Sequence, residues 1–181
     1  MKKVIFISVL ILLNAVCAWG IQRDKGPFAG RPEGRYADAA LETFRQNIPP
    51  VARQFIGTPY EYGGNPESSG TSDNSYLFFS IYSRTAQLSG LEYHGYLPMQ
   101  NLLENTRPIS ENQIQNGDLM VLNDQLAAMI FHIEDSGRLH LIYASEKRNE
   151  VITFHSDNLV FYSYWLENLQ GFFRLNDDML K

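Results

Sequence analysis

Few side chains in this sequence are suited to nucleophilic or acid–base chemistry. The only thiol is Cys17, which lies in an apolar N-terminal segment. Thr71, Ser72 and Ser75 provide hydroxyl groups near a predicted helix start. Four histidines are available as bases: His94, His132, His140 and His155. A hydroxyl or thiol attacks a carbonyl only when a base within hydrogen-bond reach takes its proton, so any such mechanism depends on what the fold brings together.

Metal sites and paired-carboxylate sites are not indicated. No two histidines are spaced i, i+4 on a predicted helix and no acidic cluster has ligand spacing, so we expect no metal and no cofactor. Glu134 and Asp135 fall at a predicted hairpin tip, and Asp177 and Asp178 fall in the C-terminal tail. Solvated charge is the ordinary explanation for such pairs.

Residues 1–18 are typical of a secretory signal peptide. Lys2 and Lys3 form a basic start, residues 4–13 are apolar, and cleavage after Ala18 fits the small residues there. The apolar run is too short to span a bilayer. Lipid attachment at Cys17 is the alternative, although the residues before it fit a lipoprotein site poorly. We therefore expect a periplasmic or secreted protein with no transmembrane helix in the mature chain.

The charge balance excludes one class of partner. Cleavage after Ala18 would remove two lysines and no acid, so the net charge of −5 would become −7. No run of Lys or Arg is present, and nucleic-acid binding needs such a basic face. The acidic balance also disfavours simple adhesion to an anionic wall polymer or membrane.

Periodicity divides the rest of the chain into an arm and one domain. Residues 19–35 are rich in Gly, Pro and Arg and are interpreted as a flexible N-terminal arm. We assign residues 36–181 to a single domain. Residues 36–48 have helical spacing, Pro49-Pro50 are predicted to interrupt that helix, and a further turn or two follows to Gly57.

A second helix and a set of strands follow. Asp73 is the predicted N-cap of a helix that reaches Leu88 and stops at Gly90. The strand candidates are residues 118–122, 126–133, 139–144, 151–154 and 172–175. Helices followed by a meander of strands predict an α+β fold, with the N-terminal helices packed on a small antiparallel β-sheet.

Several segments between about residues 52 and 175 resemble, in collinear order, motifs of the NlpC/P60 papain-like cysteine peptidases. They are residues 57–64 (the G-x-P-Y-x-aromatic-G-G entry), 71–77 (the D-C-S-G helix start), Leu97-Pro98, 115–121 (the G-D-L strand), 127–131 (the H-V-G-I-Y strand), 141–145 (the I-H-A-S strand), Tyr164-Trp165 and 171–174. The resemblance implies the papain-like NlpC/P60 fold and a role in the bacterial cell wall.

The same resemblance indicates that the catalytic residues are replaced. The family cleaves cell-wall peptides with a cysteine thiolate at a helix start, a histidine base and a second polar residue that orients the base. Those positions hold Asn74, Ala127 and Tyr143 here. An Asn amide is not a nucleophile and Ala transfers no proton, so the resemblance implies a pseudoenzyme with no catalytic residue.

Substitute residues are an open alternative. Strand side chains alternate between faces, so a replacement base should lie an even number of residues from the one it replaces. His132 is five residues from Ala127 and His140 is three from Tyr143. Both should point away from the site unless a bulge shifts the register.

The residues predicted to bind a ligand in the vestigial cleft are Tyr60, Tyr62, Asp73, Asn74, Ser75 and Tyr143. Simpler interpretations stay open for most of them. Asn74 and Asp73 are also good helix-start residues, and Tyr60 and Tyr62 could be packing aromatics.

Three functions follow as hypotheses. The first is binding of a peptidoglycan stem peptide or an envelope protein without cleavage. The second is a cell-wall peptide hydrolase that uses substitute residues around Ser75. The third is a structural subunit of an envelope assembly, in which the outer surface does the work.

Overall fold

Helix α1 (Glu33–Ala52) opens the part of the chain described by the computed structural model, residues 33–123 and 126–181. The predictions for residues 1–32, including the signal peptide, lie outside the described residues. Helix α1 begins at Glu33, and the bounds of the predicted N-terminal arm stay a prediction. No described helix is both long and apolar enough to cross a membrane.

The predicted interruption at Pro49-Pro50 is wrong, since α1 continues to Ala52 with both prolines inside it. Proline lacks the N–H that would bond to the carbonyl four residues earlier. For Pro49 that carbonyl belongs to Arg45, and Asn116 Nδ2 donates to it instead at 3.3 Å. A tertiary contact thus replaces the missing helical hydrogen bond. The short 3-10 helix η1 (Arg53–Phe55) follows.

Helix α2 (Asn74–Leu88) confirms the prediction for its start and end. Asp73 is the N-cap, and its Oδ1 accepts a hydrogen bond from the Tyr76 N–H at 2.8 Å. Gly90, just beyond the helix, has a φ of 71°, a conformation that glycine adopts without strain.

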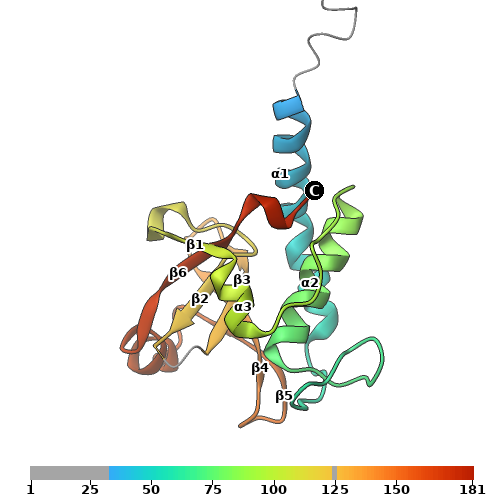
Figure 1. The fold of residues 1–181 in the computed structure, drawn as a ribbon. Helices are drawn as coiled ribbons and strands as arrows, with labels where there is room; N and C mark the ends of the chain where they lie inside the picture. Colours follow the sequence, from blue (N-terminus) through green and yellow to red (C-terminus); the bar gives the residue numbers. More distant parts are fainter. Residues whose placement is uncertain (1–32, 124–125) are drawn as a thin grey trace, which may run out of the picture. The chain divides into compact units, whose positions relative to one another are not determined.

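Six strands form one antiparallel sheet in the order β1-β6-β2-β3-β4-β5. The strands are β1 (Thr106–Ile109), β2 (Leu119–Leu122), β3 (Ala127–Ile133), β4 (Leu139–Ser145), β5 (Glu150–His155) and β6 (Leu169–Leu175). The predicted α+β class is confirmed, and the five strand candidates correspond to β2–β6. Figure 1 shows α1 and α2 together on one side of this sheet.

The remaining short elements were not predicted from the sequence. They are α3 (Met99–Glu104), strand β1, the 3-10 helices η2 (Glu111–Gln113) and η4 (Asp177–Met179), and the π-helix η3 (Phe161–Leu166). Each has at most six residues, which is too short to show a period. Strand β1 also contains Pro108, which a sheet tolerates at its edge.

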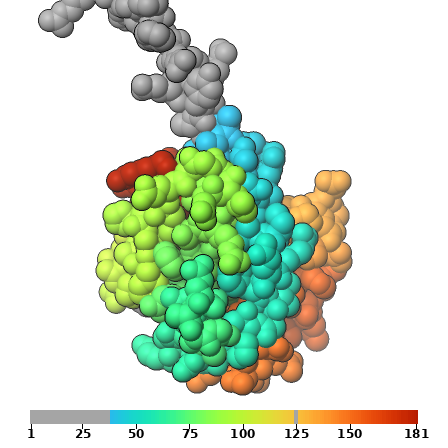
Figure 2. Space-filling view, turned by 90° about the vertical axis from the view of Figure 1, so that its right-hand side faces the viewer, coloured from blue at the N-terminus to red at the C-terminus, as the bar shows by residue number. Residues whose placement is uncertain are grey.

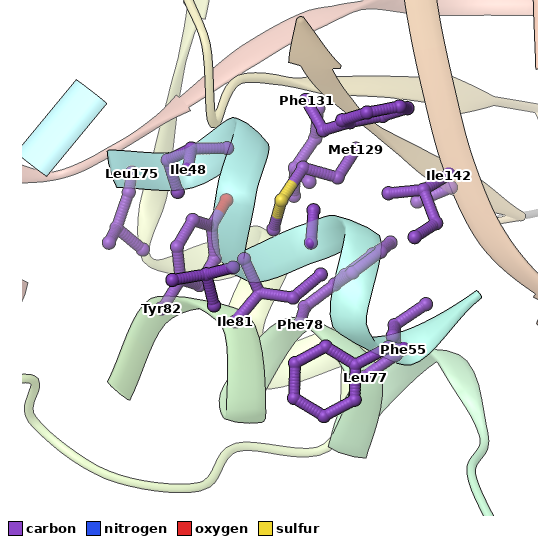
Figure 3. Packing of buried hydrophobic residues seen from close by; sticks show 14 of the residues in the cluster. Ile48, Phe55, Leu77, Phe78, Ile81, Tyr82, Met129, Phe131, Ile142 and Leu175 are labelled. Atoms are coloured by element: carbon purple, nitrogen blue, oxygen red, sulfur yellow. The ribbon is translucent and has the colours of Figure 1, made fainter. Parts of the chain in front are cut away.

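The hydrophobic core lies on both faces of the sheet. On the helix side, Ile48, Ile81 and Tyr82 pack against Met129 and other buried strand residues (Figure 3). On the opposite side, a smaller cluster joins strand residues such as Ile130 and Leu141 to Phe161 and Trp165 of the π-helix. The π-helix segment therefore covers that second face.

A buried ion pair ties the start of β2 to β6. Asp118, only 1% exposed, accepts hydrogen bonds from Arg174 Nε at 2.9 Å and Nη2 at 2.8 Å. The Gln115 N–H donates to Asp118 Oδ2 at 2.7 Å, and Arg45 lies 3.6 Å away. The hydrogen bonds to Asp118 raise the pKa of Arg174. Both residues belong to motif segments singled out in the sequence.

Candidate functional site

A hollow of about 790 Å³ lies where the N-terminus of α2, the end of β4 and the π-helix meet. We call it the cleft. Its walls include all six residues predicted to bind a ligand: Tyr60, Tyr62, Asp73, Asn74, Ser75 and Tyr143. Ala127 is fully buried and does not line it. The structure thus brings the predicted binding residues together, while their roles stay predictions.

The loop before α2 is held in place by its own hydrogen bonds, by Asn149, and by the Val151 carbonyl of β5, which accepts from the Gly57 N–H at 2.9 Å. Asp73 Oδ2 accepts a hydrogen bond from the Gly63 N–H at 3.0 Å. One carboxylate therefore both caps α2 and binds the backbone of the loop. The Tyr60 N–H donates to the Asn149 carbonyl at 2.9 Å. Figure 2 shows this loop in teal and green beside the orange residues that follow β4. A Cβ at Gly64 would lie 2.5 Å from Thr71 Oγ1, so only glycine fits there.

Asn74 connects the start of α2 to strand β4. Its Oδ1 accepts a hydrogen bond from the Ala144 N–H at 2.7 Å. The β3–β4 register extends from Ile133↔Leu139 to Met129↔Ile142, so Ala144 lies beyond the last pair and the Asn74 side chain supplies its acceptor. Within the described residues, Asn74 Nδ2 has no hydrogen-bond partner. Asn74 is therefore a structural link with one donor group left for a ligand.

We expect Asn74→Ala to lower the free energy of unfolding by about 1–3 kcal/mol, because the buried Ala144 N–H loses its acceptor. Asn74→Asp keeps an oxygen at that point and should retain most of the stability. Urea denaturation measures the change, and hydrogen exchange at the Ala144 amide locates it. Equal exchange rates at Ala144 in the wild type and Asn74→Ala would contradict this role.

Tyr143 faces the other side of the sheet from the helices. Its ring makes edge contacts with Trp165 at 5.3 Å and Phe154 at 5.8 Å between centroids. Ala127 belongs to the core cluster on the helix side. Of the three positions that the resemblance assigns to catalysis, Asn74 contacts β4, Ala127 is buried in the core on the helix side, and Tyr143 packs on the second face.

None of the four histidines, all of which are described, lines the cleft. The β3–β4 register shifts between Ile130 and His132, so the irregularity that the sequence argument allowed for is present in β3. His132 nevertheless does not line the cleft. His132, His140 and His155 form a row across β3, β4 and β5, with neighbouring ring centroids 5.2 and 5.0 Å apart. His140 Nε2 lies 2.6 Å from Glu134 Oε1. These three histidines thus form a cluster near the β3–β4 hairpin, whereas His94 lies after α2 and its N–H donates to the Met179 carbonyl.

Glu134 anchors this histidine row. Hydrogen bonds from Arg138 and His140 lower the pKa of Glu134 to about 2. Arg138 also binds Asp157 at 3.0 Å and so connects the hairpin to the end of β5. Among the described residues, no group of three or more His, Cys, Asp or Glu side chains could hold a metal ion.

Several residues of the cleft were not predicted from the sequence. They are Met99, Leu126, Ala144, Ser145, Glu146, Lys147, Val160, Tyr164 and Trp165. Ala144-Ser145 and Tyr164-Trp165 had been singled out, as parts of motif segments rather than as walls. Residues after β4 and in the π-helix reach the cleft only through the tertiary fold, so local sequence patterns gave no signal for them.

The cleft is aromatic and polar, with a negative side. Burial raises the pKa of Tyr60, and the nearby carboxylates of Glu146 and Asp73 raise it further. Tyr62 is 90% exposed, so its ring stands at the entrance. Such groups can hold a ligand by hydrogen bonds and aromatic contacts. They include no thiol and no imidazole that could carry out acyl transfer.

Comparison with known proteins identifies the fold. The chain superposes on a Staphylococcus aureus protein of the NLP/P60 family, described as similar to lipoprotein, with a TM-score of 0.51 and 22% identity over 74% of this chain and 41% of the other. It superposes on a Bacillus cereus NlpC/P60 family protein with a TM-score of 0.52 and 19% identity over 72% and 40%. The chain thus spans about two fifths of the length of these two proteins.

A third structure, the peptidoglycan hydrolase RipB from Mycobacterium tuberculosis, has a TM-score of 0.48 and 15% identity over 79% of this chain and 67% of the other. That score adds nothing to the fold assignment. No family model and no curated protein matches the sequence. The first two superpositions confirm the predicted NlpC/P60 fold.

Proposed function

We propose that this protein is exported as a single papain-like domain and binds a cell-wall peptide in the cleft without cleaving it. The observation that carries the proposal is the state of Asn74. The residue at the start of α2 has a neutral amide whose oxygen is already bonded to Ala144. What remains available is a hydrogen-bond donor beside aromatic walls, which suits binding rather than attack.

The ligand class rests on the fold and on the chemistry of the walls. A peptide has carbonyl groups that can accept from Asn74 Nδ2 and from the hydroxyl groups of Ser75 and Tyr60. The aromatic ring of Tyr60 adds apolar contact, as in most small-ligand sites. The NlpC/P60 resemblance favours stem peptides of peptidoglycan over other peptides.

We expect soluble muropeptides to bind the purified protein and Tyr60→Ala to weaken that binding about 5- to 100-fold, which corresponds to about 1–3 kcal/mol for a lost buried partner. Asn74→Ala should have a similar effect. Isothermal titration calorimetry measures the affinity. Leu88→Ser is the matched control, because Leu88 is exposed at the far end of α2 and does not line the cleft.

The binding proposal and the hydrolase alternative differ in what happens to peptidoglycan. If the protein only binds, incubation with peptidoglycan sacculi and free stem peptides should release no new fragments that mass spectrometry detects. Fragment release that disappears in Ser75→Ala would establish the hydrolase instead. Unchanged affinity in both Tyr60→Ala and Asn74→Ala would move the function from the cleft to the outer surface, as the structural-subunit hypothesis requires.

A further inference from the structure

The π-helix segment exposes an unusual amount of apolar surface. Five neighbouring side chains have exposed fractions between 36% and 78%: Leu159, Val160, Tyr162, Tyr164 and Leu166. The same segment buries Phe161 and Trp165 against the sheet. One short segment thus has an inner face that completes the core and an outer face that nothing in the described part of the chain covers.

A second hollow, of about 400 Å³, lies beside this segment, and we call it the π-helix groove. Its apolar lining includes Phe161, Tyr162 and Leu166 of the π-helix together with Ile114, Leu139 and Phe172. The groove opens on the sheet face away from α1 and α2. An apolar hollow with exposed tyrosine and leucine at its rim resembles the anchor pockets of protein interfaces.

The charges around the groove are acidic. Glu111 lines the groove, and Glu167 directly follows Leu166. Within the described residues, neither carboxylate takes part in an ion pair or a side-chain hydrogen bond. Among the residues that the structure describes, no lysine or arginine lines the groove, and Arg138 is engaged by Glu134 and Asp157. The groove therefore offers the unpaired carboxylate of Glu111, and Glu167 is the residue next to its wall in the sequence.

We propose that the π-helix groove docks an apolar side chain of a basic polypeptide segment from a partner protein. The apolar walls supply the binding energy, and Glu111 and Glu167 select for lysine or arginine beside the anchor. The acidic rim opposes an anionic membrane, and the net charge of −5 opposes a second copy of the chain. The π-helix groove is separate from the cleft, which is proposed to bind a cell-wall peptide.

The test uses three synthetic nine-residue peptides that alternate lysine with leucine, glutamate with leucine, and lysine with serine. Fluorescence anisotropy gives their affinities, and amide NMR shifts locate the contact. We expect the lysine–leucine peptide to bind at least tenfold more tightly than the other two and to shift the groove residues Glu111, Ile114, Phe161, Tyr162 and Leu166 rather than the cleft residues. Glu111→Lys combined with Glu167→Lys should reverse the order in favour of the glutamate–leucine peptide.

Control variants separate this contact from non-specific attraction to an acidic protein. Tyr162→Ser combined with Leu166→Ser should weaken lysine–leucine binding at least tenfold, whereas Leu88→Ser, another exposed apolar residue, should leave it unchanged. Lysine–leucine binding is measured separately from muropeptide binding, so failure here is distinct from failure of the cleft proposal.

Three outcomes would overturn the proposal. One is lysine–leucine affinity that neither double variant alters. Another is self-association in sedimentation experiments that Tyr162→Ser combined with Leu166→Ser abolishes, because the occupant would then be a second copy. The third is binding to phosphatidylcholine–phosphatidylglycerol vesicles that the same double variant abolishes, because the occupant would then be a membrane.

Discussion

Arg174→Ala should lower the free energy of unfolding by about 3–5 kcal/mol, as measured by urea denaturation. The substitution leaves the carboxylate of Asp118, 1% exposed, without its two-point partner. Removing one partner of a buried ion pair leaves an uncompensated charge. This lowers the free energy of unfolding far more than replacing the whole pair by apolar residues does. Arg45, at 3.6 Å, is too distant to replace those two hydrogen bonds.

Two further variants make this prediction specific. Arg174→Lys keeps the charge but not the planar fork, so its stability should lie between the wild type and Arg174→Ala. Arg107 is the matched control. It lies opposite Arg174 in the β1–β6 register, but its own ion pair, with Asp177, is exposed. Arg107→Ala should cost less than about 1 kcal/mol. A similar loss in Arg107→Ala and Arg174→Ala would refute the buried-pair argument.

Trp165→Ala should cost about 3–5 kcal/mol, since it removes a large, 2% exposed side chain from the second face of the sheet. The indole stacks on Phe154 with centroids 4.7 Å apart and contacts Tyr143 edge-on. Thermal and urea unfolding measure the loss. Trp165→Phe keeps part of the packing and should lose less.

The neighbouring Tyr164 is the control for that prediction. Its side chain is 42% exposed and lines the cleft beside Trp165. Tyr164→Ala should therefore change stability by less than about 1 kcal/mol. If Tyr164→Ala and Trp165→Ala were equally destabilising, the π-helix would owe its stability to its outer face rather than to the core beneath it.

Local patterns predicted the fold well where an element is long or carries its own end signals. Asp73 and Gly90 mark the ends of α2, and alternating or continuous apolar runs mark β2–β6. The prediction failed at Pro49, because the acceptor left free in α1 is satisfied by Asn116, more than sixty residues away. It also missed the π-helix, whose six residues have no distinctive period.

The cleft shows the same limit. The resemblance brought Tyr60, Asp73 and Asn74 into one site, and the structure places all three in its walls. Neither the resemblance nor strand alternation placed Tyr143 on the second face. The register shift between Ile130 and His132 likewise depends on cross-strand pairing, which a single strand sequence does not encode.

The hydrogen bond between Asn74 and Ala144 also restricts how this fold could evolve. Asn74→Cys would exchange a carbonyl acceptor for a weakly accepting sulfur, so stability would fall before any reactivity is gained. Because natural proteins stand close to a stability threshold, that substitution would be disfavoured by selection. Selection for stability alone should therefore keep an amide or carboxylate oxygen at position 74.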